Sequence, residues 1–468
     1  MRRKLITALM SGVLLGLAVL AVPQPTQATA GVTFYISDST PAASVGAGTS
    51  CTDPDVEYDP LTGLEAALGA IYEDTDFDSG DEIVLCDVDA TDGNVDYVMV
   101  ADVAFDDGNF DDDNNAGTAN AATLDLSDAV APGSVTIRGD ADDVNSIVID
   151  ANDGDGPDTG GYSPFDFTDA NVTIEFLTIL NAWDDSAGGA IHVMEVDSTN
   201  GLTLTLNSVV IEYAYAQGGD GAGAHVMGDV VITDSVFEDN ATGGAPAGDG
   251  GAVYATGDVT ITDSEFIGNS AEGYGGAVYV DGELRVSQVS VTDTIFDGNT
   301  SGNSGGAIYA ASIESLTIES NQFRRNTAAG QGGAIRVQWG TGGTSITRNT
   351  FTENSAEQGG AVSINDGEDD SYLWSISRNT FTKNRATLNG GALHMALDNS
   401  GNVVTPNVKG NRFNRNSAPA AGAVVVESDY GTERVILRRY ERALRRNSFQ
   451  ANRATSERRS ANIGVHFD

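Results

Sequence analysis

The sequence predicts an all-β protein, a right-handed, single-stranded parallel β-helix (a solenoid) of about ten to eleven coils with an N-terminal cap. A Phe-x-x-Asn motif recurs from Phe237 to Phe449 in steps of 29, 30, 27, 28, 30, 32 and 36 residues. A Gly-Gly-Ala-aliphatic motif alternates with it. No stretch between the motifs shows a sustained 3.6-residue apolar period, which excludes crossover helices. A regular repeat without helices is typical of a solenoid whose coils stack on one another.

Each repeat contains short segments with the alternation of a strand. In one copy, Val259 and Ile261 alternate with threonines, the period-two pattern of a strand with one buried face. A repeat of this length has room for about three strands, each pairing with its counterpart one coil above and below. Similar segments precede the first full motif, at 135–139, 147–150, 172–181 and 202–211. The β-helix is therefore expected to begin near residue 131.

The repeated residues have structural roles in this fold. We expect the Phe rings to stack from coil to coil at the spacing of paired strands, about 4.8 Å. The Asn amides would point inward and form a ladder that satisfies buried backbone groups. The predicted ladder consists of Phe237, Asn240, Phe266, Asn269, Phe296, Asn299, Phe323, Asn326, Phe351, Asn354, Phe381, Asn384, Phe413 and Asn416.

The paired glycines are expected at a tight corner of each coil. Glycine permits positive φ and a close approach of two backbones. The predicted turn glycines are Gly188, Gly189, Gly250, Gly251, Gly275, Gly276, Gly305, Gly306, Gly332, Gly333, Gly359, Gly360, Gly390 and Gly391.

The N-terminus has the pattern of an export signal. Arg2, Arg3 and Lys4 precede an apolar stretch at 5–22, and small residues allow cleavage after Ala30. An uncleaved membrane anchor is the alternative, because the apolar stretch could just span a bilayer. After cleavage no transmembrane span would remain. The mature protein is therefore expected to be secreted or to lie at the cell surface.

We divide the chain into a signal peptide (1–30), an acidic N-terminal cap region (31–130), the β-helix (131–430) and an Arg-rich last coil with the C-terminal end (431–468). Cys51 and Cys86 in the cap region are expected to form one disulfide, because exported proteins meet an oxidising compartment. A short amphipathic helix at 61–72 would cover the first coil, since the open end of a β-helix is an unpaired sheet edge.

Charge is distributed unevenly along the chain, whose net charge is -44. Residues 31–323 hold 55 acids and two bases, whereas residues 324–468 hold 13 acids and 19 bases. Such an acidic surface would repel phosphates, so nucleic acid is excluded as a partner. The basic C-terminal end has two interpretations: a solvated cap, or a surface that meets an acidic partner such as another copy of the chain or an anionic cell-wall polymer. The oligomeric state stays open.

The paired motifs at about 186–455 resemble the polymorphic outer membrane protein repeat (Chlamydia-type), in which Gly-Gly-Ala-Ile is followed by Phe-x-x-Asn. The resemblance implies a surface-exposed or secreted bacterial right-handed parallel β-helix, often adhesin-like. The segments 62–68, 136–139 and 149–152 resemble, more weakly, the region that precedes many bacterial surface β-helices.

Candidate chemistry is sparse. Asp150, Asn152, Asp153 and Asp155 lie among glycines and could bind Ca²⁺, which prefers six to eight oxygens from flexible loops. Loose solvated loops are the favoured interpretation of these residues. No catalytic residue is singled out. His192, His225 and His394 follow the glycine motifs and could face outward on one side.

Two functions follow from these observations. The first is a secreted or cell-surface scaffold, adhesin-like, that presents a rigid flank to an extracellular glycan or protein. The alternative is a β-helix polysaccharide lyase or glycoside hydrolase, which would use carboxylates as acid and base. A groove with Asp, Glu or Arg clustered across neighbouring coils would favour the enzyme, and a uniformly polar flank would favour the scaffold.

Overall fold

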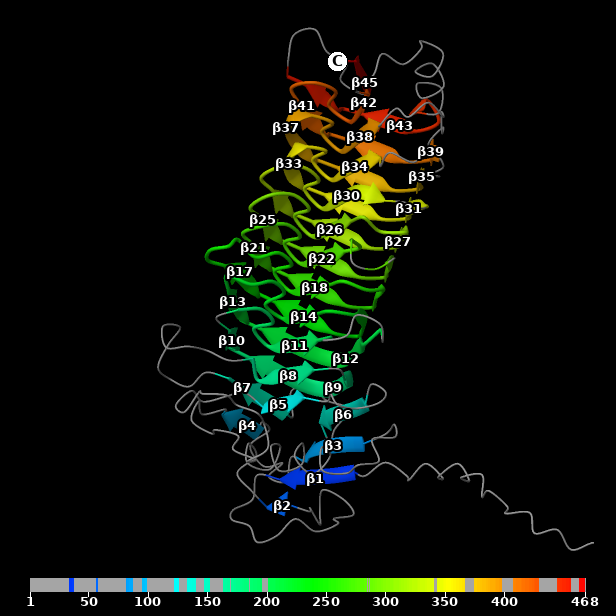
Figure 1. Cartoon of the computed structure of the whole chain (residues 1–468). Coiled ribbons are helices and arrows are strands. Elements are labelled where there is room, and N and C mark those ends of the chain that lie inside the picture. The colour runs from blue at the N-terminus through cyan, green and yellow to red at the C-terminus, as the bar shows by residue number, and fades with distance from the viewer. Residues whose placement is uncertain are drawn as a thin grey trace, which may run out of the picture.

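A computed structural model gives the architecture as a rod of stacked coils (Figure 1). It describes residues 163–366, 374–397, 407–428 and 444–455, except 169, 185, 196–200, 284, 286 and 341–342, and the segments 33–37, 56–57, 81–86, 95–98, 122–125, 133–139, 147–151 and 463–467. Every element bounded within these residues is a β-strand. All strand pairs are parallel, as the register of each coil on the next requires.

The coils build three sheets. Within the described residues, sheet 1 has 23 strands, sheet 2 has 10 and sheet 3 has 12. The strands of sheet 1 are β1 (Thr33–Ser37), β2 (Val56–Glu57), β3 (Asp81–Cys86), β4 (Val95–Val98), β6 (Gly133–Gly139), β7 (Ile147–Asp150), β9 (Ala170–Leu180), β12 (Thr203–Glu212), β15 (Asp229–Thr233), β16 (Val236–Glu238), β19 (Val259–Thr262), β20 (Glu265–Ile267), β23 (Gln288–Thr292), β24 (Ile295–Asp297), β27 (Ser315–Glu319), β28 (Gln322–Arg324), β31 (Thr344–Thr347), β32 (Thr350–Thr352), β35 (Trp374–Ser377), β36 (Thr380–Thr382), β39 (Asn407–Lys409), β40 (Arg412–Asn414) and β43 (Ser448–Gln450).

The strands of sheet 2 are β10 (Trp183–Asp184), β13 (Tyr215–Gln217), β17 (Ala241–Gly243), β21 (Ser270–Ala271), β25 (Thr300–Ser301), β29 (Thr327–Ala328), β33 (Ser355–Gln358), β37 (Arg385–Asn389), β41 (Ser417–Ala418) and β44 (Arg453–Ala454). The strands of sheet 3 are β5 (Ala122–Asp125), β8 (Phe165–Thr168), β11 (Ile191–Met194), β14 (Ala224–Val226), β18 (Val253–Ala255), β22 (Val278–Asp281), β26 (Ile308–Ala311), β30 (Ile335–Gly340), β34 (Val362–Asp366), β38 (Leu393–Leu397), β42 (Val424–Ser428) and β45 (Ile463–Phe467).

One coil consists of two strands in sheet 1, one in sheet 2 and one in sheet 3. In the coil that begins with β19, the chain passes through β20 and β21 and returns along β22. The predicted fold class is confirmed, with about eight regular turns where ten to eleven coils were expected. Parallel pairing also extends into the predicted cap region, because β1 pairs with β3 and β3 with β6. The predicted helix at 61–72 lies outside the described residues.

The Phe residues of the motif form a continuous stack inside the rod. Their ring centroids are separated by 4.8 to 5.1 Å from Phe237 to Phe449. The Phe residues from Phe237 to Phe413 are fully buried. The spacing equals that of the paired strands, so strand register places each ring on the next.

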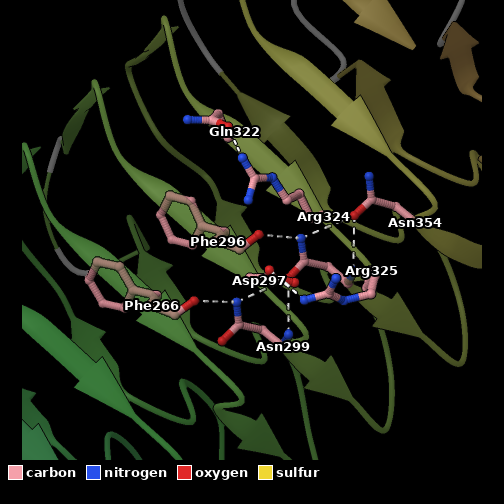
Figure 2. Close-up of polar contacts among 9 residues, drawn as sticks. Phe266, Phe296, Asp297, Asn299, Gln322, Arg324, Arg325 and Asn354 are labelled. Carbon is pink, nitrogen blue, oxygen red and sulfur yellow. Dashed lines mark hydrogen bonds and ion pairs between the residues drawn. The ribbon is translucent and has the colours of Figure 1, made fainter. Parts of the chain in front are cut away.

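The Asn residues of the motif form a buried hydrogen-bonded ladder next to this stack (Figure 2). Nδ2 of Asn299 donates to the Phe266 carbonyl at 2.9 Å and to Oδ1 of Asn326 at 3.0 Å. Oδ1 of Asn299 accepts from the backbone N–H and from Nδ2 of Asn269, both at 3.0 Å. Each amide therefore ties its coil to both neighbouring coils.

A second inward ladder, which the sequence motifs do not predict, lies two residues before each Phe. It begins with Ser235, Ser264 and Thr294 and continues as asparagines from Asn321 to Asn447. Nδ2 of Asn321 donates to Oδ1 of Asn349 at 3.2 Å. The change from hydroxyl to amide side chains concealed this periodicity in the sequence.

The two glycines of each pair have different physical roles. Gly275 has a φ of 62°, the left-handed region that favours glycine. A Cβ on Gly276 would lie 2.2 Å from the Gly306 carbonyl oxygen, so no side chain fits between the coils there. One glycine turns the chain and the other permits the next coil to approach.

Candidate functional site

The Phe, Asn and Gly motif residues face the interior or the corners of the coils, so they present no chemistry to a ligand. Of the predicted Ca²⁺ ligands, Asp150 ends β7, and Asn152, Asp153 and Asp155 lie outside the described residues. Cys86 ends β3, and Cys51 lies outside the described residues, so the disulfide stays a prediction. In the described part of the chain, no three His, Cys, Asp or Glu side chains gather as metal ligands.

The predicted outward histidines belong to one row on sheet 3. Each strand of this sheet alternates core residues with outward ones, as in β22, where Val278 and Val280 join the core and Tyr279 lies between them. Strand register aligns the outward residues of successive coils. The outer row, as we name it, consists of Asp166, His192, His225, Tyr254, Tyr279, Tyr309, Arg336, Ser363 and His394.

The centre of the outer row is a stack of aromatic rings. The centroid of His225 lies 4.8 Å from that of Tyr254, Tyr254 lies 5.3 Å from Tyr279, and Tyr279 lies 5.2 Å from Tyr309. Tyr274, from the turn before β22, contacts the ring of Tyr309 at 4.5 Å. Because the rings cover each other's faces, a ligand would meet their edges and hydroxyl groups.

Three carboxylates border this stack. Oδ2 of Asp281 accepts from the Tyr254 hydroxyl at 3.4 Å. Asp220 and Asp249 occupy equivalent turns of neighbouring coils, and Oδ1 of Asp220 accepts the backbone N–H of Asp249 at 2.7 Å. We name Asp220, Asp249, Asp281, Tyr254, Tyr274, Tyr279 and Tyr309 the acid–tyrosine cluster. All of them except the buried Tyr309 are half-buried, so the cluster is recessed but reaches solvent.

The carboxylates of the cluster are electrostatically coupled. Burial, together with the charges of Asp220 and Asp281, raises the pKa of Asp249 to about 6, against a hydrogen bond from Tyr274 that lowers it. Burial and the charge of Asp281 also raise the pKa of Asp220. Burial and the same acids raise the pKa of Tyr254. Negative charge is therefore concentrated where the row is recessed.

The N-terminal end of the row holds an acid and two histidines. Nδ1 of His192 lies 3.2 Å from Oδ1 of Asp166. Burial and the neighbouring His192 lower the pKa of His225 to about 3, so its imidazole is neutral at physiological pH. Nδ1 of His225 is buried and has no hydrogen-bond partner among the described residues. A polar atom of the row thus stays unsatisfied beside the cluster.

The C-terminal end of the row is a hydrogen-bonded relay. Nη1 of Arg336 donates to Oγ of Ser363 at 2.8 Å, and Oγ of Ser363 lies 3.0 Å from Nδ1 of His394. Nε2 of His394 lies 3.1 Å from Oε2 of Glu427. This order matches a nucleophile, its base and an orienting acid.

Burial argues against catalysis by this relay. Ser363 is 0% exposed and His394 2% exposed, so a substrate carbonyl cannot approach the hydroxyl. Gln331 adds a further contact to Oγ of Ser363 at 3.3 Å. The relay is instead a satisfied polar network that stabilises four neighbouring coils.

Comparison with known proteins agrees with this architecture. Residues 167–351 match the family model described as right handed beta helix region. The chain contains a right-handed β-helix. That description covers β-helices in general and not the polymorphic outer membrane protein repeat in particular. Searches of curated proteins and of solved structures returned no significant match.

Sequence reasoning found the histidines of the outer row but not the acid–tyrosine cluster. Tyr254, Tyr279 and Tyr309 follow the same Gly-Gly-Ala-aliphatic signal as the histidines, and could have been aligned by it. The three acids have no common place in the repeat, because Asp281 ends a strand and the other two precede glycines.

No helix in the described part of the chain is long and apolar enough to cross a membrane.

Proposed function

We propose that the protein is a glycan-binding β-helix that works outside the cell, with the acid–tyrosine cluster as its contact site. The observation that carries this proposal is the half-buried row of stacked tyrosines bordered by Asp220, Asp249 and Asp281. Carboxylates and phenolic hydroxyls are the acceptors and donors that recognise sugar hydroxyls. A rigid sheet presents them without a large entropic cost of ordering.

The repetition of the site favours a polymer. The row places a ring at every coil, at separations of 4.8 to 5.3 Å, over four consecutive strands. An extended chain lying along the rod could contact several coils at once, which increases affinity without new kinds of contact. Such contacts would suit an adhesin-like role at the cell surface, which the predicted export signal and the resemblance to the outer membrane protein repeat support.

A glycan array tests the proposal. The full chain would be compared with Tyr279→Phe, which removes one hydroxyl of the cluster and keeps the ring stack. Tyr213→Phe is the matched control, because Tyr213 is 54% exposed and directly follows β12 of sheet 1, outside the outer row of sheet 3. We expect Tyr279→Phe to weaken binding about two- to tenfold, which corresponds to the free energy that one hydrogen bond contributes. Absence of binding to every glycan, or equal affinities of the two variants, would refute the proposal.

Export is tested separately. Fractionation of the source cells, followed by N-terminal sequencing of the protein, should find it outside the cytoplasm with its mature chain beginning at Gly31. A cytoplasmic protein that retains Met1 would contradict this part of the proposal.

One observation favours a second candidate, a glycoside hydrolase. With a pKa of about 6, Asp249 can hold a proton near neutral pH beside other carboxylates, as a general acid must. Incubation of glycans bound on the array with wild type and Asp249→Asn would decide. Release of new reducing ends by wild type but not by Asp249→Asn supports a hydrolase. If the glycans stay intact with wild type, the result supports binding without cleavage.

A further inference from the structure

We infer that the acid–tyrosine cluster selects glycans that carry free amino groups and discriminates against glycans that carry carboxylates. This inference rests on the proposed function, whose glycan class it specifies. It follows from the charge of the cluster, from the unfilled hydrogen-bonding capacity of its acids and from the burial of Arg336, the base next to it in the outer row.

The cluster carries three acids without a neutralising base. Arg285 is the only Lys or Arg between residues 201 and 323. It is engaged elsewhere, because its Nη2 lies 2.5 Å from Oε2 of Glu195. Arg336, the next base along the row, is buried and donates to Ser363. Its charge lies beside Tyr274 and Tyr309, and not among the three acids. A uronate carboxylate at the acids would therefore meet like charges, while the cation next to Tyr309 is buried and already engaged.

The acids retain acceptor capacity. The oxygens Oδ1 of Asp220 and Asp249 accept the backbone N–H groups of Asp249 and Tyr274 at 2.7 and 2.6 Å. Their Oδ2 oxygens have no hydrogen-bond partner within the described residues. An ammonium group is a compact donor of three hydrogen bonds, and between these acids it would offset the repulsion that couples them.

A second feature points to a ligand at the same place. Nδ1 of His225 is buried and unpaired, and the ring of His225 stacks on Tyr254, whose hydroxyl meets Asp281. Because this imidazole is neutral, it adds no competing positive charge to the cluster. Because the ring faces are stacked on each other, a ligand cannot stack on them, and the hydroxyl groups are the polar contacts that the rings offer.

The test uses oligosaccharides that share one backbone and differ in charge. The free-amine oligomer of β-1,4-linked glucosamine, its fully N-acetylated counterpart and a β-1,4-linked oligoglucuronate of the same length would be titrated calorimetrically into the full chain. The pH would lie near the pKa of about 6 of Asp249. We expect the free-amine oligomer to bind at least about tenfold more tightly than the acetylated one, and the uronate not to bind.

Because the chain is strongly acidic overall, the variants must separate a site from general attraction. Asp249→Asn should weaken binding of the free-amine oligomer about tenfold. Asp263→Asn removes the same charge from an exposed turn of sheet 1, where asparagine also tolerates the φ of 48°, and should leave binding unchanged. Equal effects of both variants would overturn the inference.

The remaining outcomes are distinct. Tighter binding of the acetylated oligomer or of the uronate overturns the amine preference and leaves the glycan-binding proposal standing. If none of the three oligomers binds and the full chain binds no glycan on the array, both the amine preference and the glycan-binding proposal are refuted. Oligolysine that binds as tightly and with the same sensitivity to Asp249→Asn would assign the cluster to basic peptides and overturn the glycan class.

Discussion

The buried Asn ladder makes a sharp prediction at Asn326. Its side chain takes part in four hydrogen bonds: Oδ1 accepts from the backbone N–H and Nδ2 of Asn299, and Nδ2 donates to the Phe296 carbonyl and to Oδ1 of Asn354, all at 3.0 Å. Asn326→Ala removes all four. At about 0.5 to 1.5 kcal/mol net for each bond, the free energy of unfolding should fall by about 2 to 6 kcal/mol.

Asn326→Asp provides the more discriminating perturbation, because it keeps the shape of the side chain. It replaces the donor Nδ2 by an oxygen that faces the Phe296 carbonyl and Oδ1 of Asn354, two acceptors. It also buries a charge without a partner. We therefore expect Asn326→Asp to destabilise the fold at least as much as Asn326→Ala.

Urea unfolding followed by circular dichroism measures both variants. The control is Asn303→Ala, at an exposed turn position of the preceding coil, which should change the free energy of unfolding by less than about 0.5 kcal/mol. If Asn326→Ala behaves like this control, or if Asn326→Asp is as stable as wild type, the ladder contributes no stability and the reasoning fails.

Three further predictions concern other parts of the structure. Gly276→Ala should destabilise the rod or prevent folding, because its Cβ would lie 2.2 Å from a backbone oxygen. Gly298→Ala, with nothing within 4 Å of its Cβ, should lower the free energy of unfolding by only about 1 kcal/mol because of its φ of 73°. Thermal melting compares the two variants, and equal melting temperatures would contradict this prediction. Phe323→Ala should lower the free energy of unfolding by about 3 to 5 kcal/mol, because a fully buried ring is lost from the stack, and a loss below 1 kcal/mol in urea unfolding would refute it. The pKa of Asp249 is raised from 3.8 to about 6 in the folded chain, so its contribution to stability is present at low pH and lost as pH rises through about 6. Relative to Asp249→Asn, wild type should therefore lose up to about 3 kcal/mol between acidic and neutral pH, and parallel pH–stability curves would rule this out.

The sequence alone was sufficient to predict the β-helix because the motif residues that hold its coils together repeat. Each coil must present Phe, Asn and a glycine pair at equivalent points, since every coil stacks on a copy of itself. The stack from Phe237 to Phe449 and the amide ladder at Asn299 show these residues where the spacing predicts them. The second ladder was missed, because Ser264 and Asn321 accept the equivalent backbone N–H of the preceding coil with different side chains.

Only the tertiary structure decided which outward residues meet. Asp220 and Asp249 lie in turns of two coils and Asp281 ends β22, so no single motif marks the three acids as a group. Strand register brings them together, because residues about one coil apart in the chain lie only one strand spacing apart on the rod. A ligand site on a solenoid need not repeat from coil to coil. Sequence periodicity therefore predicts the core residues and does not predict which surface residues form a site. The repeat therefore determined the rod, and the stacking of its coils determined the cluster of acids and tyrosines on its flank.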